Sequence, residues 1–486
     1  MAGGHVALFP LPFQGHLSPA LQLADALHGR GLAITVLHTT FNAPDSAAHP
    51  EFGFVAVADG GMPDAKDGIG KILAMNDAME ESGCVRDALA ALEPRPSCLV
   101  IDTSLPAAQK AAAELGMPTV VLHTGSAAAI RLFRSYAMLH DKGYLPAQEH
   151  ELDKPVKELA PIRVSDLFDP SKYPNPEMAN RLLDTATEVT DNSSGVVINT
   201  FEALETPELK AIRSELAASG VGVFAIGPLH KLSAIGGAGS SLLEADRSCI
   251  EWLDAQAAGS VLYVSFGSVA PVSREDFEEV AWGLANSGRP FLWVVRRGLV
   301  IGSGAEDVEL PEGFERAAEG RGKVVRWAPQ QEVLGHRAVG GFWTHSGWNS
   351  TPEGICEGVP MLCRPLFGDQ LANGRYVEEV WRTGALLAGK LERGKVAEAI
   401  ARFMEGDDGA AMRERAKELQ IKAMEALGSA GSTQLAVDKF DRSHTVPMSR
   451  SNTWFTWCSL SERVCGYGMQ TIIFLRDGLQ RLLVPH

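Results

Sequence analysis

Short apolar runs alternate with stretches of helical periodicity through the first half of the chain. The apolar runs have the length of buried strands, and the stretches between them repeat apolar residues with the period of a helix. The predicted strands are residues 5–10, 32–37, 98–102, 120–122, 196–200 and 223–226, and the predicted helices include residues 18–28 and 105–115. Buried strands separated by helices predict a parallel sheet with helices on both faces.

The second half repeats this alternation after a segment of linker composition. Residues 233–241 are Gly-, Ser- and Ala-rich, which favours a domain boundary there. The predicted strands beyond it are residues 261–266, 291–295, 324–325, 339–343 and 361–364, and the predicted helices are 248–253, 275–286, 371–381 and 410–427. We therefore predict an α/β protein of two facing, Rossmann-like, doubly wound parallel-sheet domains, residues 1–240 and 241–441, with an atypical tail at 442–486.

A strand–loop–helix junction lies inside residues 327–370. The predicted strand ends at His345, small and hydroxyl residues follow at 346–350, and a helix is predicted to start at Thr351. Backbone N–H groups and the helix dipole converge at such a junction, which favours binding of an anion.

Two features of residues 327–370 go beyond an ordinary anion site. Trp327 opens the segment with a ring on which a flat base could stack, and Asp369 and Gln370 close it with groups suited to a polyol. An ordinary strand–helix unit would explain the loop but neither the Trp nor the Asp-Gln pair. Base, diphosphate and sugar each have a candidate receiver, so the segment predicts a nucleotide-sugar site.

This segment, which we call the signature segment, resembles the signature box of plant secondary-metabolite UDP-glycosyltransferases of the family 1 type. It has the Trp-Ala-Pro-Gln opening at 327–330, the His-Ser-Gly-Trp-Asn-Ser-Thr centre at 345–351 and the Asp-Gln end at 369–370. The resemblance covers roughly residues 1–440. It implies the GT-B architecture, with a cleft between the domains, and UDP-glucose as donor.

The resemblance also implies roles for individual residues in holding the UDP-sugar. His345, Asn349, Ser350 and Ser268 would contact the phosphates, Trp327 would stack on uracil, and Glu353 would bind the ribose. Asp369 and Gln370 would hold the sugar hydroxyls, and Gln at the last position usually accompanies glucose. The full predicted set is Thr124, Ser268, Trp327, Ala328, Gln330, His345, Gly347, Trp348, Asn349, Ser350, Glu353, Asp369 and Gln370.

His16 and Asp102 are the candidate catalytic pair. Each follows a predicted strand, so both lie at the sheet edge where open α/β sheets bind ligands. An imidazole, with a usual pKa of about 6.5, accepts a proton near neutrality, and a carboxylate partner fixes its tautomer. The family's His–Asp dyad falls on these positions, which implies a single displacement that inverts the sugar and yields a β-glucoside.

Composition and charge limit the partners, the metal or disulfide sites and the location that the chain could have. The 486 residues carry a formal charge of −16, which disfavours nucleic acid and anionic membranes as partners. Seven scattered cysteines make neither a disulfide framework nor a zinc pattern. We expect no metal and no cofactor, with UDP-glucose and a small-molecule acceptor as the substrates. No secretory signal or membrane span is recognisable, so a cytoplasmic protein is expected, as a monomer.

The acceptor and the tail leave alternatives open. Residues 126–128 and 142–146 look like the grass benzoxazinoid glucosyltransferase branch, with flavonoids and other phenolics as further acceptors. A catalytically impaired UDP-sugar-binding protein and a UDP-sugar epimerase are the alternative functions. A nicotinamide oxidoreductase is disfavoured because no G-x-G-x-x-G follows the first strand. The tail beyond 442 fits either a poorly ordered product of an altered reading frame or splicing, or a partner-binding element.

Overall fold

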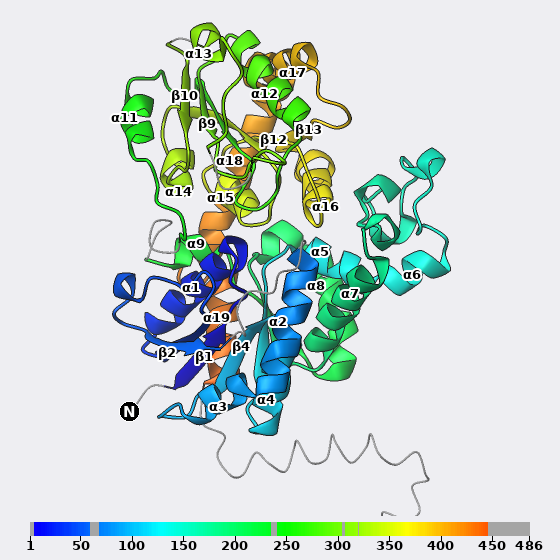
Figure 1. Cartoon of the computed structure of the whole chain (residues 1–486), viewed down its shortest axis with the longest axis vertical. Helices are drawn as coiled ribbons and strands as arrows, with labels where there is room; N and C mark the ends of the chain where they lie inside the picture. Colours follow the sequence, from blue (N-terminus) through cyan, green and yellow to red (C-terminus); the bar gives the residue numbers. More distant parts are fainter. Residues whose placement is uncertain (1–3, 59–67, 235–240, 304–306, 319, 446–486) are drawn as a thin grey trace, which may run out of the picture. The chain divides into compact units, whose positions relative to one another are not determined.

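A computed structural model of the chain describes residues 4–58, 68–234, 241–303, 307–318 and 320–445 (Figure 1). Its helices are α1 (Gln14–His28), α2 (Gly68–Ser82), α3 (Cys84–Ala90), α4 (Pro106–Glu114), α5 (Ala127–Arg134), α6 (Tyr136–Asp141), α7 (Pro176–Asp191), α8 (Glu202–Leu216), α9 (Leu229–Leu232), α11 (Ser248–Asp254), α12 (Arg274–Asn286), α13 (Phe314–Ala317), α14 (Gln330–Leu334), α15 (Ser350–Cys356), α16 (Gln370–Arg375), α17 (Arg393–Glu405), α18 (Asp407–Leu427) and α19 (Ser432–His444). A π-helical turn, η7 (Tyr376–Val380), extends α16. Short 3-10 turns are η1 (Ser46–Ala48), η2 (Glu149–Glu151), η3 (Lys157–Leu159), η4 (Val164–Asp166), η5 (Pro170–Lys172) and η6 (Ala217–Ser219).

The first half forms a seven-stranded sheet in the order β3-β2-β1-β4-β5-β6-β7, in which every pair is parallel. The strands are β1 (His5–Phe9), β2 (Ala33–Thr39), β3 (Gly53–Val57), β4 (Cys98–Asp102), β5 (Thr119–His123), β6 (Gly195–Ile198) and β7 (Gly222–Ala225). The chain order reverses between β1 and β4, and in doubly wound sheets such a switch point opens the ligand crevice.

The second half forms a six-stranded parallel sheet in the order β10-β9-β8-β11-β12-β13. The strands are β8 (Val261–Ser265), β9 (Phe291–Val294), β10 (Gly322–Val325), β11 (Val339–Thr344), β12 (Met361–Cys363) and β13 (Gly384–Leu386). Here the switch point lies between β8 and β11. The predicted fold of two doubly wound sheets is confirmed.

Four local predictions differ from the structure. Residues 14–16 of the loop predicted at 13–16 form the first turn of α1 instead, with Phe13 as the N-cap and Pro19 inside the helix. The edge strand β3 was missed because its residues are largely only half-buried, and β13 was missed because it is three residues long. The helix predicted with Thr351 as its N-cap has Asn349 at that position and begins at Ser350.

The last described helix returns to the first sheet. Helix α19, orange in Figure 1, lies against β7, and Phe440 packs edge-on against Phe224 with ring centroids 5.6 Å apart. Residues 235–240 of the linker predicted at 233–241, and residues 446–486 of the tail predicted at 442–486, lie outside the described residues. Among the helices that the structure describes, none has both the length and the apolarity to cross a bilayer.

Candidate active site

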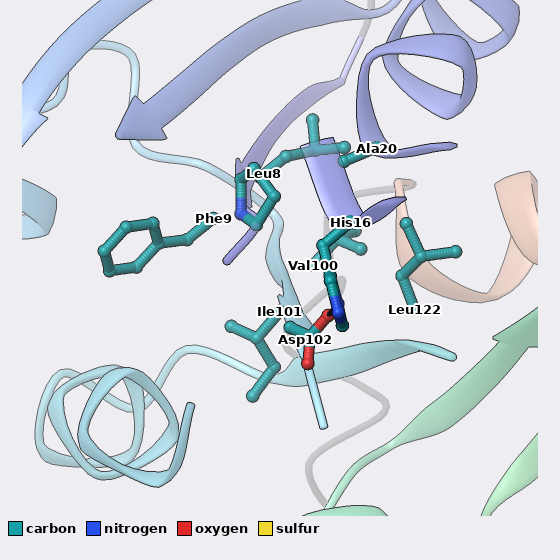
Figure 2. A pocket seen from close by; sticks show the side chains of 9 residues that line it. Leu8, Phe9, His16, Ala20, Val100, Ile101, Asp102 and Leu122 are labelled. Atoms are coloured by element: carbon teal, nitrogen blue, oxygen red, sulfur yellow. Dashed lines mark hydrogen bonds and ion pairs between the residues drawn. The ribbon is translucent and has the colours of Figure 1, made fainter. Parts of the chain in front are cut away.

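His16 and Asp102 meet at the switch point of the first sheet. Nδ1 of His16 lies 2.6 Å from Oδ2 of Asp102, and the two side chains stand together in Figure 2. Asp102 ends β4 and its side chain is 3% exposed, whereas that of His16 is 32% exposed. The carboxylate accepts a hydrogen bond from the Nδ1–H group, which leaves Nε2 as the imidazole nitrogen with a free lone pair. The pair therefore has the geometry of a general base and its orienting partner.

The electrostatics of this pair favour an ionised carboxylate beside a basic imidazole. Burial lowers the pKa of His16, but the charge of Asp102, its hydrogen bond and the charge of Asp369 raise the pKa above its usual value. Burial raises the pKa of Asp102, yet His16 and the Ser104 N–H group lower it below its usual value. The Ser104 N–H group lies 3.1 Å from Oδ1 of Asp102 and holds the carboxylate in place.

Pro19 leaves a backbone carbonyl next to His16 free to bond to the second domain. In an α-helix the N–H of residue 19 would bond to the carbonyl of residue 15, but proline has no N–H. The Gly15 carbonyl instead accepts a hydrogen bond of 2.9 Å from Nδ2 of Asn349, in the signature segment. The residue next to His16 is thus bonded directly to the loop predicted to hold the diphosphate.

Thr124 and His123 lie beside the dyad. Oγ1 of Thr124 is 3.2 Å from Nδ1 of His16. Nδ1 of His123 accepts the Gly125 N–H group at 3.1 Å, and burial lowers the pKa of His123 to about 4. His123 is therefore neutral at physiological pH. Behind His16 and Asp102, a cavity of about 10 Å³ (Figure 2) is just large enough for one water.

Two glycines form the sides of the slot that holds His345 at the end of β11. A Cβ built on Gly267 or on Gly347 would lie 2.5 Å or 2.4 Å from Nε2 of His345, so only glycine fits at either position. Burial, with the nearby charge of Arg296, lowers the pKa of His345 to about 4. Ser268 directly follows Gly267 in the loop after β8, so these residues gather at the second switch point.

Arg296 was not predicted from the sequence. It is 8% exposed, and its guanidinium donates to the carbonyls of Gly267 and Ala270 at 2.8 and 2.7 Å. It therefore shapes the loop that carries Ser268 and places a positive charge close to His345. A run of basic residues after a strand was the available signal, but the sequence did not show which carbonyls they would reach.

Glu353, predicted to bind the ribose, is bonded to Gln330, predicted to lie beside uracil, and Gln330 is also bonded to Ser350, predicted to contact the phosphates. Nε2 of Gln330 donates to Ser350 Oγ at 2.9 Å and to Glu353 Oε2 at 2.6 Å, and Gln331 donates to Glu353 Oε1 at 3.0 Å. Burial raises the pKa of Glu353 and these hydrogen bonds oppose the rise. Ala328 is buried nearby, in the turn before α14.

Trp327 is half-buried next to an open pocket of about 550 Å³. Its indole N–H donates to Ser241 Oγ at 3.2 Å, and its carbonyl accepts the Asp246 N–H group at 2.9 Å. Val295, Val325 and Arg326 also line the pocket. These bonds fix the ring beside a space at the carboxyl ends of β9 and β10.

Asp369 and Gln370 lie at the start of α16. Oε1 of Gln370 accepts the N–H groups of Leu366 and Phe367 at 3.0 and 3.3 Å, which fixes the loop before the helix. Burial raises the pKa of Asp369, and the hydrogen bond from Asn373 opposes the rise. The Ser126 hydroxyl of the first half donates to Oδ1 of Asn373 in α16 at 2.9 Å, so the two halves approach each other here.

Comparison with known proteins identifies the family. The model of the family described as "UDP-glucoronosyl and UDP-glucosyl transferase" matches residues 209–416. The DIMBOA UDP-glucosyltransferase BX9 of Zea mays is 46% identical, over 88% of this chain and 93% of the relative. The chain belongs to the plant family 1 UDP-glycosyltransferases. A further relative, UDP-glycosyltransferase 76B1 of Arabidopsis thaliana, is 41% identical, over 88% of this chain and 95% of its own length.

Solved structures agree with this assignment. Phytolacca americana UGT2, complexed with UDP-2fluoro-glucose and pterostilbene, matches with a TM-score of 0.76 and 27% identity, over 91% of this chain and 99% of that one. Os79 from O. sativa, in complex with UDP, matches with a TM-score of 0.74 and 28% identity, over 90% and 100% of the two chains. The GT-B fold predicted for this UDP-glycosyltransferase is confirmed.

Three aromatic side chains join the two domains of this UDP-glycosyltransferase. The indole N–H of Trp348 donates to the Asn199 carbonyl at 2.9 Å, that of Trp381 to the Leu204 carbonyl at 3.1 Å, and the Tyr376 hydroxyl to Glu208 at 2.7 Å. All three rings are buried. We call them the aromatic clamp. Trp348, predicted to lie near the sugar, thus has its indole N–H committed to the first domain, and its place in the sugar site stays a prediction.

The structure brings the predicted residues of this glycosyltransferase into four groups. His16, Asp102 and Thr124 form the first, and the loops at the ends of β8 and β11 form the second. The start of α16 forms the third, and the fourth lies around α14 and the first turn of α15, with Trp327, Ala328, Gln330 and Glu353. Among the described residues, no three His, Cys, Asp or Glu side chains gather as a metal site would require.

Proposed function

We propose that this UDP-glycosyltransferase transfers glucose from UDP-glucose to a hydroxyl of a small lipophilic plant metabolite, with inversion, to give an O-β-glucoside. The observation that carries the proposal is the 2.6 Å contact between His16 and Asp102, one residue away from the Gly15–Asn349 bond to the donor segment. A base oriented by a carboxylate and placed beside a nucleotide-sugar site suits attack by an alcohol.

In the proposed reaction, Nε2 of His16 takes the proton of the acceptor hydroxyl. The oxygen forms a bond to the anomeric carbon from the face opposite the diphosphate, and the bond from that carbon to the phosphate oxygen breaks. The electron pair leaves on UDP, and Asp102 stabilises the imidazolium that has formed. Donors from Ser268, His345 and Asn349 stabilise the charge on the diphosphate without a metal ion.

The relatives support the donor and the acceptor class. Two maize proteins at 46% identity are named DIMBOA UDP-glucosyltransferases, and a structural neighbour is complexed with UDP-2fluoro-glucose and pterostilbene. We propose benzoxazinoids as the first acceptor class to test, with flavonoids and other phenolics beside them. Trp327 and Glu353 would hold the nucleoside, and Asp369 and Gln370 the glucose.

The test is to incubate the purified protein with UDP-glucose and a mixed acceptor panel, and to identify products by mass spectrometry and anomeric configuration by NMR. A β-glucoside from wild type, none from His16→Ala, and equal UDP binding by both is the expected result. UDP-sugar conversion without an acceptor would favour an epimerase. Binding without any turnover would favour a UDP-sugar-binding protein. An α-glucoside would refute inversion.

A further inference from the structure

Asn373 has every polar group of its side chain bonded, on three different segments. Nδ2 donates to Asp369 Oδ2 at 2.9 Å and to the Ser346 carbonyl at 3.1 Å, and Oδ1 accepts the Ser126 hydroxyl at 2.9 Å. The side chain is 1% exposed. An amide has two N–H donors and a carbonyl acceptor, so both donors and the acceptor are used.

The bond to Ser126 crosses between the two domains. Ser126 is the N-cap of α5, and its Oγ also accepts the Ala129 N–H group at 2.9 Å. Glu205 accepts the Ala127 and Ala128 N–H groups at 3.0 and 2.9 Å, so the first turn of α5 is fixed within the first domain. Asn373 therefore bonds to a rigid element of the acceptor side.

Ser126 lies two residues from Thr124, whose hydroxyl is 3.2 Å from His16. A short path of bonded groups thus runs from the Asp369 carboxylate, through Asn373 and Ser126, to the loop beside the dyad. The second N–H group of the Asn373 amide donates to the carbonyl of Ser346, in the loop after β11. Ser346 has a φ of 65°, in the left-handed region. A residue needed only to fill space would not require this pattern of polar partners.

We propose that Asn373 is a positioning residue that fixes the Asp369 carboxylate relative to the 124–126 loop, and so aligns the donor sugar with the His16 base. The inference rests on the proposed function, because it takes Asp369 as a sugar ligand. Asn373 does not itself touch the reacting atoms. Its loss allows the sugar to shift against the base, and displacements of about 1 Å at that point cost about a hundredfold in rate.

The test compares Asn373→Ala, Ser126→Ala and the double variant with wild type. We expect kcat with UDP-glucose to fall about tenfold to a hundredfold in Asn373→Ala, as loss of hydrogen bonds to a charged group implies. The dissociation constant of UDP, measured by calorimetry, should stay within about twofold, because UDP lacks the sugar. The double variant should be little worse than Asn373→Ala.

Ser126→Ala also removes the N-cap of α5, so its control is a variant that loses an N-cap elsewhere. Ser273→Ala removes the bond from the Asp276 N–H group at the start of α12 and leaves the domain contacts intact. Its kcat should match wild type. An unchanged kcat in Asn373→Ala, additive losses in the double variant, or UDP binding weakened as much as turnover would overturn the proposal. If Asn373→Ala fails to fold, an unchanged kcat in Ser126→Ala would overturn it and a tenfold loss there would support it. If the wild-type protein transfers no glucose, the proposed function is refuted, and not the role of Asn373 alone.

Discussion

Replacing Asp102 with Asn separates the two effects of the carboxylate on His16. In the wild type, the carboxylate raises the pKa of the imidazole through its charge and through a 2.6 Å hydrogen bond, and this outweighs the lowering by burial. The amide keeps the size of the side chain but removes the charge. Burial then dominates, so the pKa of His16 in Asp102→Asn should fall below its usual value.

The magnitude follows from the bond that is lost. A hydrogen bond to a charged group contributes about 1.5–3 kcal/mol, and one pKa unit corresponds to about 1.4 kcal/mol. The pKa of His16 should therefore fall by about one to two units. A base acts in its neutral form, so activity is lost as pH falls through this pKa. The acidic limb of kcat/KM should lie above pH 6.5 in the wild type and move below it in the variant.

The height of the profile should change as well. The amide introduced by Asp102→Asn would donate to Nδ1 of His16, so that Nε2 carries the hydrogen and cannot accept a proton. General-base catalysis contributes about a hundredfold to ten-thousandfold, and the plateau should fall by at least the lower figure. Product formation is measured by liquid chromatography between pH 5 and 9, with Asp438→Asn, a surface ion-pair variant, as control. If the acidic limb of Asp102→Asn lies at the wild-type pH and its plateau is as high as that of the wild type, the role assigned to Asp102 is refuted.

Three further changes probe the donor side. Gly347→Ala places a Cβ 2.4 Å from His345 Nε2 and should weaken UDP binding, measured by calorimetry, at least tenfold. In the control Gly394→Ala the Cβ meets nothing within 4 Å, so UDP binding should not change. Equal UDP affinities of the two variants would contradict this prediction. Trp348→Phe leaves the buried Asn199 carbonyl without its donor and should lower the free energy of unfolding in urea by about 1–3 kcal/mol. Excess EDTA should leave transfer unchanged, and loss of activity restored by Mg²⁺ would disprove the metal-free leaving group.

The contact between His16 and Asp102 and the strand–loop–helix of the signature segment were predictable because they depend on local patterns. A buried apolar run ends at Asp102 and another ends shortly before His16, and the carboxyl ends of neighbouring parallel strands meet at one sheet edge. The sequence did not state that β1 and β4 are neighbours, but a doubly wound order makes them so. The small residues at 267 and 347 were visible as glycines, although the need to clear the His345 ring was not.

The contacts between the domains could not be predicted in the same way. Asn373 and Asn199 are ordinary polar residues in sequence, and their partners lie 247 and 149 residues away. Hydrophobic periodicity locates elements but carries no information about which elements of two separate sheets will meet. Pro19 is similar, because its consequence, a free Gly15 carbonyl, matters only when Asn349 is opposite.

The division of the site between two sheets explains why these contacts gather around it. The proposed base lies in one domain and the loops proposed to hold the donor lie in the other, so the distance between His16 and a bound sugar would depend on how the domains are aligned. Hydrogen bonds are directional and short in range, so the Gly15–Asn349 and Ser126–Asn373 bonds fix that alignment at the dyad itself. The aromatic clamp adds buried apolar area along residues 199–208. Polar bonds at the site and burial behind it would therefore together hold the proposed base at a fixed distance from the proposed donor site.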